Sequence, residues 1–225
     1  MAAAATNCKV HLVDVTLFAR RVTVSPHTGL LHNKLVQTST LKYPIRRVET
    51  KSITIPQNIT SYNLDNVFMG TVPKRIIIGF VSNEAYNGRL QSNPFYFQTF
   101  NLNKLQLQLG SRSIPITPIT PDYANNLCIQ AYFQLFAGTG IHYQDTGNGI
   151  SRDEFHKGYT LYAFNLSANI DCNDGTWELV HDSNVTLKVG FSEALASAIT
   201  CIVYAEFDSL IQIDKHRNIY TDFTK

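Results

Sequence analysis

Apolar and polar residues alternate along much of the chain, and this period of two predicts β-strands. The alternation is most regular over 185–191, where four residues share one face: Val185, Leu187, Val189 and Phe191. Leucines alternate with glutamines in the same way over 105–109, whereas 76–81 is an apolar run interrupted only by Gly79. Such a run predicts a strand that is buried on both faces.

Similar segments recur along the rest of the chain, separated by turn and loop sequences. Further strands are predicted over 9–24, 43–55, 96–109, 159–166, 199–207 and 210–214, and the tail at 216–225 is a candidate edge strand. We interpret 58–70 and the proline-containing segment 111–121 as connections, 27–36 as a short helix or loop, and 171–175 as a turn. About eight strands suit an all-β fold, a single jelly-roll β-sandwich with one principal helix and long loops. We expect this domain to span 9–225, after a disordered segment at 1–8.

The principal helix is predicted over 122–137. Asp122 is a suitable N-cap residue, and Gly138 is suited to follow the last turn. The helix carries two apolar stripes and one polar stripe, where a surface helix normally carries a single apolar face. One stripe is expected to pack on the sheet of the same domain.

The second stripe contains three large aromatic residues, Tyr132, Phe133 and Phe136. If it stayed uncovered, a monomer would expose a patch that soluble monomers rarely show. We therefore expect these three residues to form an oligomer interface. The alternative is that the loops at 111–121 and 138–158 fold back over them.

Composition and charge exclude several classes of partner. Charged residues make up 16% of the chain and the formal net charge is +2, so no cluster of cations predicts a specific nucleic-acid site. No apolar run is long enough to span a membrane, and the N-terminal residues do not resemble a signal peptide. The four cysteines form no C-x-x-C pair, and Cys128 and Cys201 are predicted to be buried thiols.

The residue types that usually carry out catalysis show no recognisable spacing. The seven histidines form neither H-x-x-x-H nor H-E-x-x-H, and the glycines over 138–149 lack the lysine of a phosphate-binding loop. The acidic pairs at 153–154 and 171–174 lack calcium-loop spacing, and Ser151 with Glu154 instead matches a capping box. We therefore predict no catalytic residue, metal ligand, cofactor or small-molecule substrate, and no enzymatic activity.

Six longer segments carry a resemblance to one protein family. They are LKYPIRRVET at 41–50, TVPKRIIIGFVSNEAYNG at 71–88, NPFYFQTFNLN at 93–103, TPDYANNL at 120–127, GNGISRDEFHKGYTLYAFNLS at 147–167 and VYAEFDSLIQIDKHRNI at 203–219. Together they strongly resemble the C-terminal part of the hexon-like major capsid proteins of polinton (Maverick) elements and adintoviruses. Related uncharacterised proteins encoded in animal genomes share them. The resemblance covers the chain from about Leu12 onward.

This resemblance implies a structural role in a virion capsid. Proteins of the family are double jelly rolls that assemble as pseudo-hexagonal trimers and tile an icosahedral shell. It implies a homotrimer that contacts other capsid proteins, after synthesis in the cytoplasm or nucleus of the host cell. The length suits one jelly roll, so the chain is expected to be a C-terminal fragment, a processed product or a stand-alone descendant. The alternative is a ligand-binding module, such as a lectin-like or receptor-binding jelly roll.

Overall fold

The structure is a computed structural model that describes residues 11–167 and 182–223. The predicted disordered segment at 1–8 and the predicted turn at 171–175 lie outside these residues. The strands are β1 (Leu41–Ile55), β2 (Ser61–Phe68), β3 (Arg75–Ser82), β4 (Leu102–Leu109), β5 (Arg112–Ile119), β6 (Leu161–Asn165), β7 (Val185–Phe191), β8 (Ile199–Ile213) and β9 (Ile219–Thr221). The helices are α1 (Pro26–Thr38), α2 (Asn83–Tyr86), α3 (Ile129–Thr139), the 3-10 turn η1 (Ile141–Tyr143) and α4 (Arg152–Phe155).

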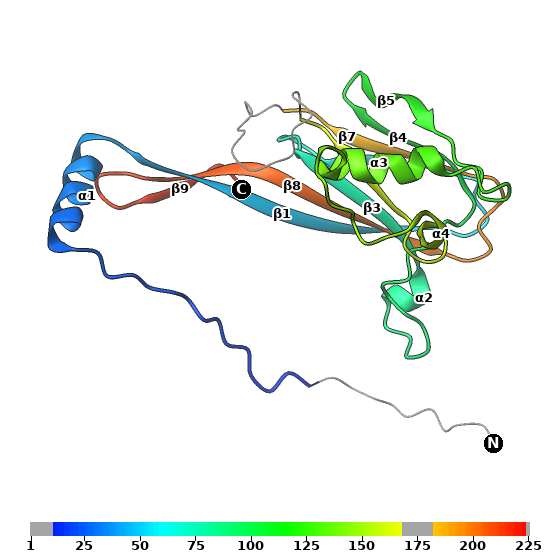
Figure 1. The fold of residues 1–225 in the computed structure, drawn as a ribbon, viewed down its shortest axis with the longest axis horizontal. Coiled ribbons are helices and arrows are strands. Elements are labelled where there is room, and N and C mark those ends of the chain that lie inside the picture. Colours follow the sequence, from blue (N-terminus) through cyan, green and yellow to red (C-terminus); the bar gives the residue numbers. More distant parts are fainter. Residues whose placement is uncertain (1–10, 168–181, 224–225) are drawn as a thin grey trace. The chain divides into compact units, whose positions relative to one another are not determined.

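The strands form two sheets whose order defines a jelly roll (Figure 1). One sheet has the order β1-β8-β3-β6, with β9 also paired to β8, and the other has the order β2-β7-β4-β5. The first strand therefore pairs with the eighth, the second with the seventh, the third with the sixth and the fourth with the fifth. This nesting is that of one long hairpin rolled into two sheets, so the predicted jelly-roll β-sandwich is confirmed.

The core lies between the two sheets and follows the alternation of the sequence. In β7, all four residues predicted to face inward are buried: Val185, Leu187, Val189 and Phe191. In β3, Ile76, Ile78 and Phe80 are fully buried, and of the two residues between them Gly79 is buried and Ile77 is partly buried. The predicted burial of Cys128 and Cys201 is also confirmed.

Several predicted strands differ from the structure. The segments 58–70 and 111–121, predicted as connections, contain β2 and β5. β5 tolerates Pro115 and Pro118 because it is the edge strand of its sheet and needs no hydrogen bonds on its outer side. The predicted strand over 96–109 begins only at Leu102, and those over 199–207 and 210–214 are one strand, β8.

The predicted strand over 9–24 is wrong for its described part. Residues 11–24 form no strand, because the structure gives them no neighbouring strand with which to pair. The segment 27–36 belongs to the helix α1. Its N-cap is Ser25, whose side chain accepts a hydrogen bond from the Thr28 amide, and Pro26 occupies the first turn.

The chain divides into two compact units. One contains the chain up to Leu41 together with Gln212–Ile219, and the other contains Lys42–Ile211 and Tyr220–Lys225. The core described above belongs to the second unit. The prediction of one domain over 9–225 stays a prediction. Within the described residues, no helix is long and apolar enough to cross a membrane.

Candidate functional site

The candidate site is the surface around α3, which follows β5 and lies along β6 (Figure 1). The predicted helix start at Asp122 is wrong. Asp122 forms a tight loop in which its amide donates to the Leu127 carbonyl, and its carboxylate accepts two hydrogen bonds from Asn125. These bonds lower the pKa of Asp122. Asn126 adopts a left-handed conformation with φ of 57°, so the helix can begin only after it, at Ile129.

The buried face of α3 is fixed very close to β6. An added Cβ on Gly138 would lie 2.2 Å from the carbonyl oxygen of Ala163, so only glycine fits there. One turn earlier, the Gln134 side chain donates to the same oxygen at 3.1 Å. Ala131 and Leu135 are buried on this face. Glycine at 138, which the sequence indicated as a helix end, is instead a close-approach residue inside the helix, and Gly140 is the C-cap.

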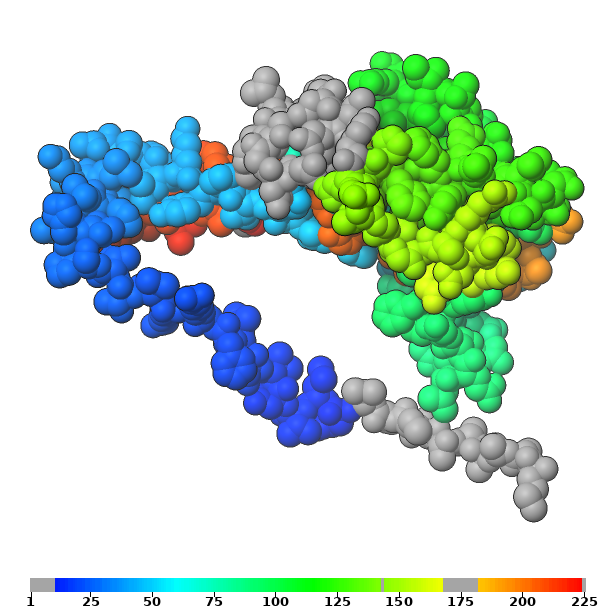
Figure 2. Space-filling model, in the orientation of Figure 1, coloured from blue at the N-terminus to red at the C-terminus, as the bar shows by residue number. Residues whose placement is uncertain are grey.

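The second stripe of α3 is partly covered by the segment that follows it. The Tyr132 hydroxyl donates to the Ile150 carbonyl at 2.8 Å, and its ring contacts Phe136 and Phe155 edge to face. Phe155 belongs to α4, whose predicted capping box is present: Ser151 and Glu154 exchange hydrogen bonds. Figure 2 shows 141–158, in yellow-green, continuing the surface of α3.

Phe133 remains 49% exposed, and its ring contacts the imidazole of His142 edge to face at 4.9 Å. Leu127 and Ile129 are exposed by 66% and 64%. We call Leu127, Ile129 and Phe133 the α3 surface. Ile129 and Phe133 are four residues apart on the helix and therefore lie on one face.

Of the three residues predicted as an oligomer interface, the structure thus leaves Phe133 the most exposed. Tyr132 and Phe136 are half-buried within the domain. The predicted helix began at Asp122 and would have contained Leu127, whereas in the structure Leu127 precedes α3. The left-handed Asn126 was the signal for the later start, since asparagine favours this conformation. The interface itself stays a prediction.

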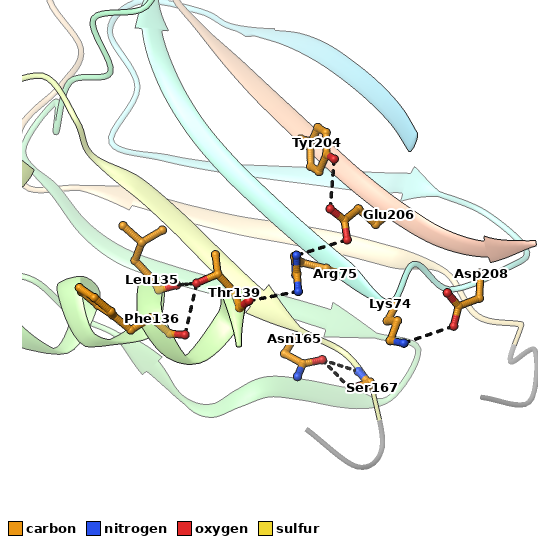
Figure 3. Close-up of polar contacts among 10 residues, drawn as sticks. All are labelled: Lys74, Arg75, Leu135, Phe136, Thr139, Asn165, Ser167, Tyr204, Glu206 and Asp208. Carbon is orange, nitrogen blue, oxygen red and sulfur yellow. Dashed lines mark hydrogen bonds and ion pairs between the residues drawn. The ribbon is translucent and has the colours of Figure 1, made fainter. Parts of the chain in front are cut away.

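A chain of polar contacts ties the C-terminal end of α3 to the sheet (Figure 3). Arg75 donates to the Thr139 carbonyl at 3.2 Å and lies 3.4 Å from a carboxylate oxygen of Glu206. The Tyr204 hydroxyl donates to the other Glu206 oxygen at 3.1 Å. A cation is favourable at this end of a helix, where backbone carbonyls carry partial negative charge.

Glu206 and a neighbouring ion pair are largely shielded from water. Glu206 is 9% exposed and Lys74 is 6% exposed, and Lys74 forms an ion pair of 3.5 Å with Asp208. Partial burial and the neighbouring Glu206 carboxylate raise the pKa of Tyr204. Each carboxylate faces a cation, as expected for a structural network. Nowhere in residues 11–167 and 182–223 do three or more potential metal ligands gather.

Two tyrosines meet where the loop before α3 contacts the core. The hydroxyls of Tyr123 and Tyr162 lie 2.6 Å apart, and the Tyr162 side chain is fully buried. Burial raises the pKa of both phenols well above the ordinary value. The pair lies beside Phe80 and Phe155 and satisfies two polar groups inside an aromatic cluster.

Comparison with known proteins gives one curated relative. It is the uncharacterized protein F54H12.2 of Caenorhabditis elegans, which is 31% identical over 195 residues. The alignment covers 85% of this chain but only 46% of the worm protein, so the chain spans about half the length of this relative. No protein-family model matches the chain.

Solved structures share the fold at low sequence identity. One is the crystal structure of PBCV-1 VP54 fitted into a reconstruction of the virophage Sputnik. Its TM-score is 0.51 at 10% identity, covering 90% of this chain and 55% of that one. Another is a quasi-atomic model of the PBCV-1 virus capsid, with a TM-score of 0.47 at 11% identity, covering 83% and 52%. The first of these likenesses supports the jelly-roll fold.

Proposed function

We propose that the chain is a structural, hexon-like capsid protein of the polinton and adintovirus type that self-assembles into a shell. The fold supports this proposal because viral capsid chains share it. The six sequence segments that resemble these capsid proteins support it further. Since the likeness to solved structures has low identity, the capsid role rests on the combination of fold and motifs.

The observation that carries the proposal is the α3 surface. The sandwich buries one stripe of α3 and the 141–158 segment covers Tyr132, yet Leu127, Ile129 and Phe133 stay about half exposed or more. An exposed apolar group beside a well-packed core marks an interaction surface. In a shell built from identical units, the occupant of this surface is another copy of the chain, and closed three-fold symmetry gives the homotrimer.

Phe133→Ser tests this contact in the 225-residue chain. We expect light scattering to show three copies, or a multiple of three, in the unmodified protein and loss of this three-fold unit in the variant, whose far-ultraviolet spectrum should be unchanged. Ile116→Ser is the matched control, because Ile116 is 89% exposed on β5 and lies outside the α3 surface. A monomeric unmodified protein, or equal losses in both variants, would show that the α3 surface is no subunit contact.

Assembly and ligand binding are distinguished by a second measurement. We expect electron microscopy of the trimer at high concentration to show sheets or shells, and a glycan array to show no specific binding. Selective binding to one glycan class by the monomer would favour the lectin-like alternative. This function would place the protein in a virion together with other capsid proteins, without enzymatic activity of its own.

A further inference from the structure

The N-terminal unit has no core of its own. Among its described residues, not one is buried. In the segment 11–24, which we call the arm, six large apolar residues are between 74% and 92% exposed: Leu12, Val13, Val15, Leu17, Phe18 and Val22. Burial of apolar surface is the main driving force for folding, so this unit needs a partner to become ordered in water.

Apolar residues of the helix α1 are exposed as well. It has no buried residue, and its three leucines, Leu30, Leu31 and Leu35, are exposed by 52% to 69%. Leu31 and Leu35 are four residues apart and therefore share one face of the helix. Arg217, in the turn at 214–218, donates a long hydrogen bond of 3.5 Å to the side chain of Asn33 in α1. The unit thus presents an apolar helix face as well as an apolar arm.

The sheet edges of the jelly roll are poor acceptors for an added strand. β5 contains two prolines, and β1 carries Pro44 among several cations. The edge of β6 is covered by α3, whose Gln134 donates to Ala163. The register of β2 shifts beside Asn66, which has φ of 53°. Prolines, cations, irregular backbone and covering helices are the usual ways in which proteins block edges. The arm of a second copy is therefore a better partner for the arm than any of these sheet edges.

The arm is self-complementary in an antiparallel pair centred on Leu17. In this register Asp14 lies opposite the second copy's Arg20, and this ion pair occurs twice because of the two-fold symmetry. Leu12 lies opposite Val22. Near the centre of the ribbon, one face then carries Val15, Leu17 and Ala19 from both copies, and Val13 lies opposite Arg21 toward each end of that face. Opposite charges and apolar pairs across strands are the interactions that stabilise antiparallel sheets.

We propose that two copies of the chain join their arms as an antiparallel two-stranded ribbon centred on Leu17, with the leucine faces of the two α1 helices packed on its apolar side. An isolated two-stranded ribbon is marginal in water, and packing against a helix makes it stable. The helix face and the apolar arm of one unit thereby cover those of the other. This two-fold contact goes beyond the proposed capsid function and does not depend on the α3 surface.

A charge-reversal cycle tests the register, made in the Phe133→Ser background of the 225-residue chain so that the arm contact is measured alone. Asp14→Arg and Arg20→Asp each turn both ion pairs into repulsions, whereas the double variant restores them with opposite polarity. We expect each single variant to raise the dimer Kd about tenfold or more in analytical ultracentrifugation. The double variant should return to near the original value. A double variant as weak as the single ones, or single variants that bind normally, would overturn the pairing.

Hydrogen exchange separates this contact from the one made by α3. The amides of 13–21 should gain protection as protein concentration rises, both in the unmodified chain and in Phe133→Ser. Failure of the capsid proposal would appear as an unchanged oligomeric state in Phe133→Ser, and it would leave arm protection intact. Arm amides that exchange freely at every concentration would overturn the ribbon. If the arm amides lost their protection in Phe133→Ser, the ribbon would depend on the α3 surface and its proposed independence would be refuted.

Discussion

Replacing Gly138 with alanine should weaken the domain, although the same change normally strengthens a helix. In an ordinary helix interior, alanine is favoured over glycine by about 1 kcal/mol. Here the new methyl group would lie 2.2 Å from the Ala163 carbonyl oxygen and 2.4 Å from its carbon. Both atoms belong to the backbone of β6, so relief requires a shift of α3 or of the strand.

The magnitude follows from what that shift disturbs. Overpacking a well-filled interior costs about 1–3 kcal/mol. Moving α3 away also strains the hydrogen bond from Gln134 to the same carbonyl, which contributes about 1 kcal/mol. These losses exceed the gain in helix propensity, so we expect Gly138→Ala to lower the free energy of unfolding by about 2 kcal/mol. For a chain of this size, the midpoint of thermal unfolding should fall by about 4–8 °C.

Urea unfolding followed by circular dichroism measures this change. Gly29→Ala is the matched control, because Gly29 lies inside α1 with no atom within 4 Å of an added Cβ. It should leave the stability of the jelly roll unchanged and increase the helical signal. If Gly138→Ala were as stable as the unmodified chain, the close approach of α3 to β6 would be refuted.

Four other variants test the core and the polar contacts. Val189→Asp should prevent folding, because burial of an unpaired carboxylate costs several kcal/mol. Lys188→Ala should change the melting temperature only slightly. Similar melting temperatures for the two variants would contradict the register of β7. Arg75→Met leaves the shielded Glu206 carboxylate without its cation, so the free energy of unfolding measured in urea should fall by about 1–3 kcal/mol. An unchanged value would show that the contact is unimportant. The phenol pKa values of Tyr123 and Tyr162 are raised in the folded state, so their contribution to stability is complete below the unfolded pKa near 10 and falls as pH rises above it. Tyr162→Phe should therefore lose less of its free energy of unfolding than the unmodified chain as pH is raised through the alkaline range. An identical dependence of the unfolding free energy on pH would contradict this prediction.

The sequence predicted the fold class because alternation directly reports which side of a strand is buried. This worked for β7, where both faces have distinct residue types, and for β3, where apolar residues mark a strand covered on both sides. It failed at β5, where Pro115 and Pro118 argue against a strand unless the position at a sheet edge is known. Edge position is a property of the whole topology, and no local pattern contains it.

The candidate site was predicted less completely for a similar reason. The sequence identified α3 and its aromatic stripe, but burial of Tyr132 depends on a hydrogen bond to Ile150, eighteen positions further along the chain. The late start of the helix depends on the loop between Asp122 and Leu127. Gly138 looked like a helix end because glycine often ends helices, whereas its function is to let two backbones approach closely.

The position of β8 between β1 and β3 has a consequence for synthesis of the protein. While the chain emerges from the ribosome, β1 and β3 are made early, yet they cannot join one sheet until the strand beginning at Ile199 has appeared. Until then β1 has no partner strand and β3 keeps one open edge, which favours association with chaperones or with other nascent chains. Pairing between strands so distant in sequence also predicts slow folding. The yield of folded protein should accordingly depend on how quickly the C-terminal part of the chain is released.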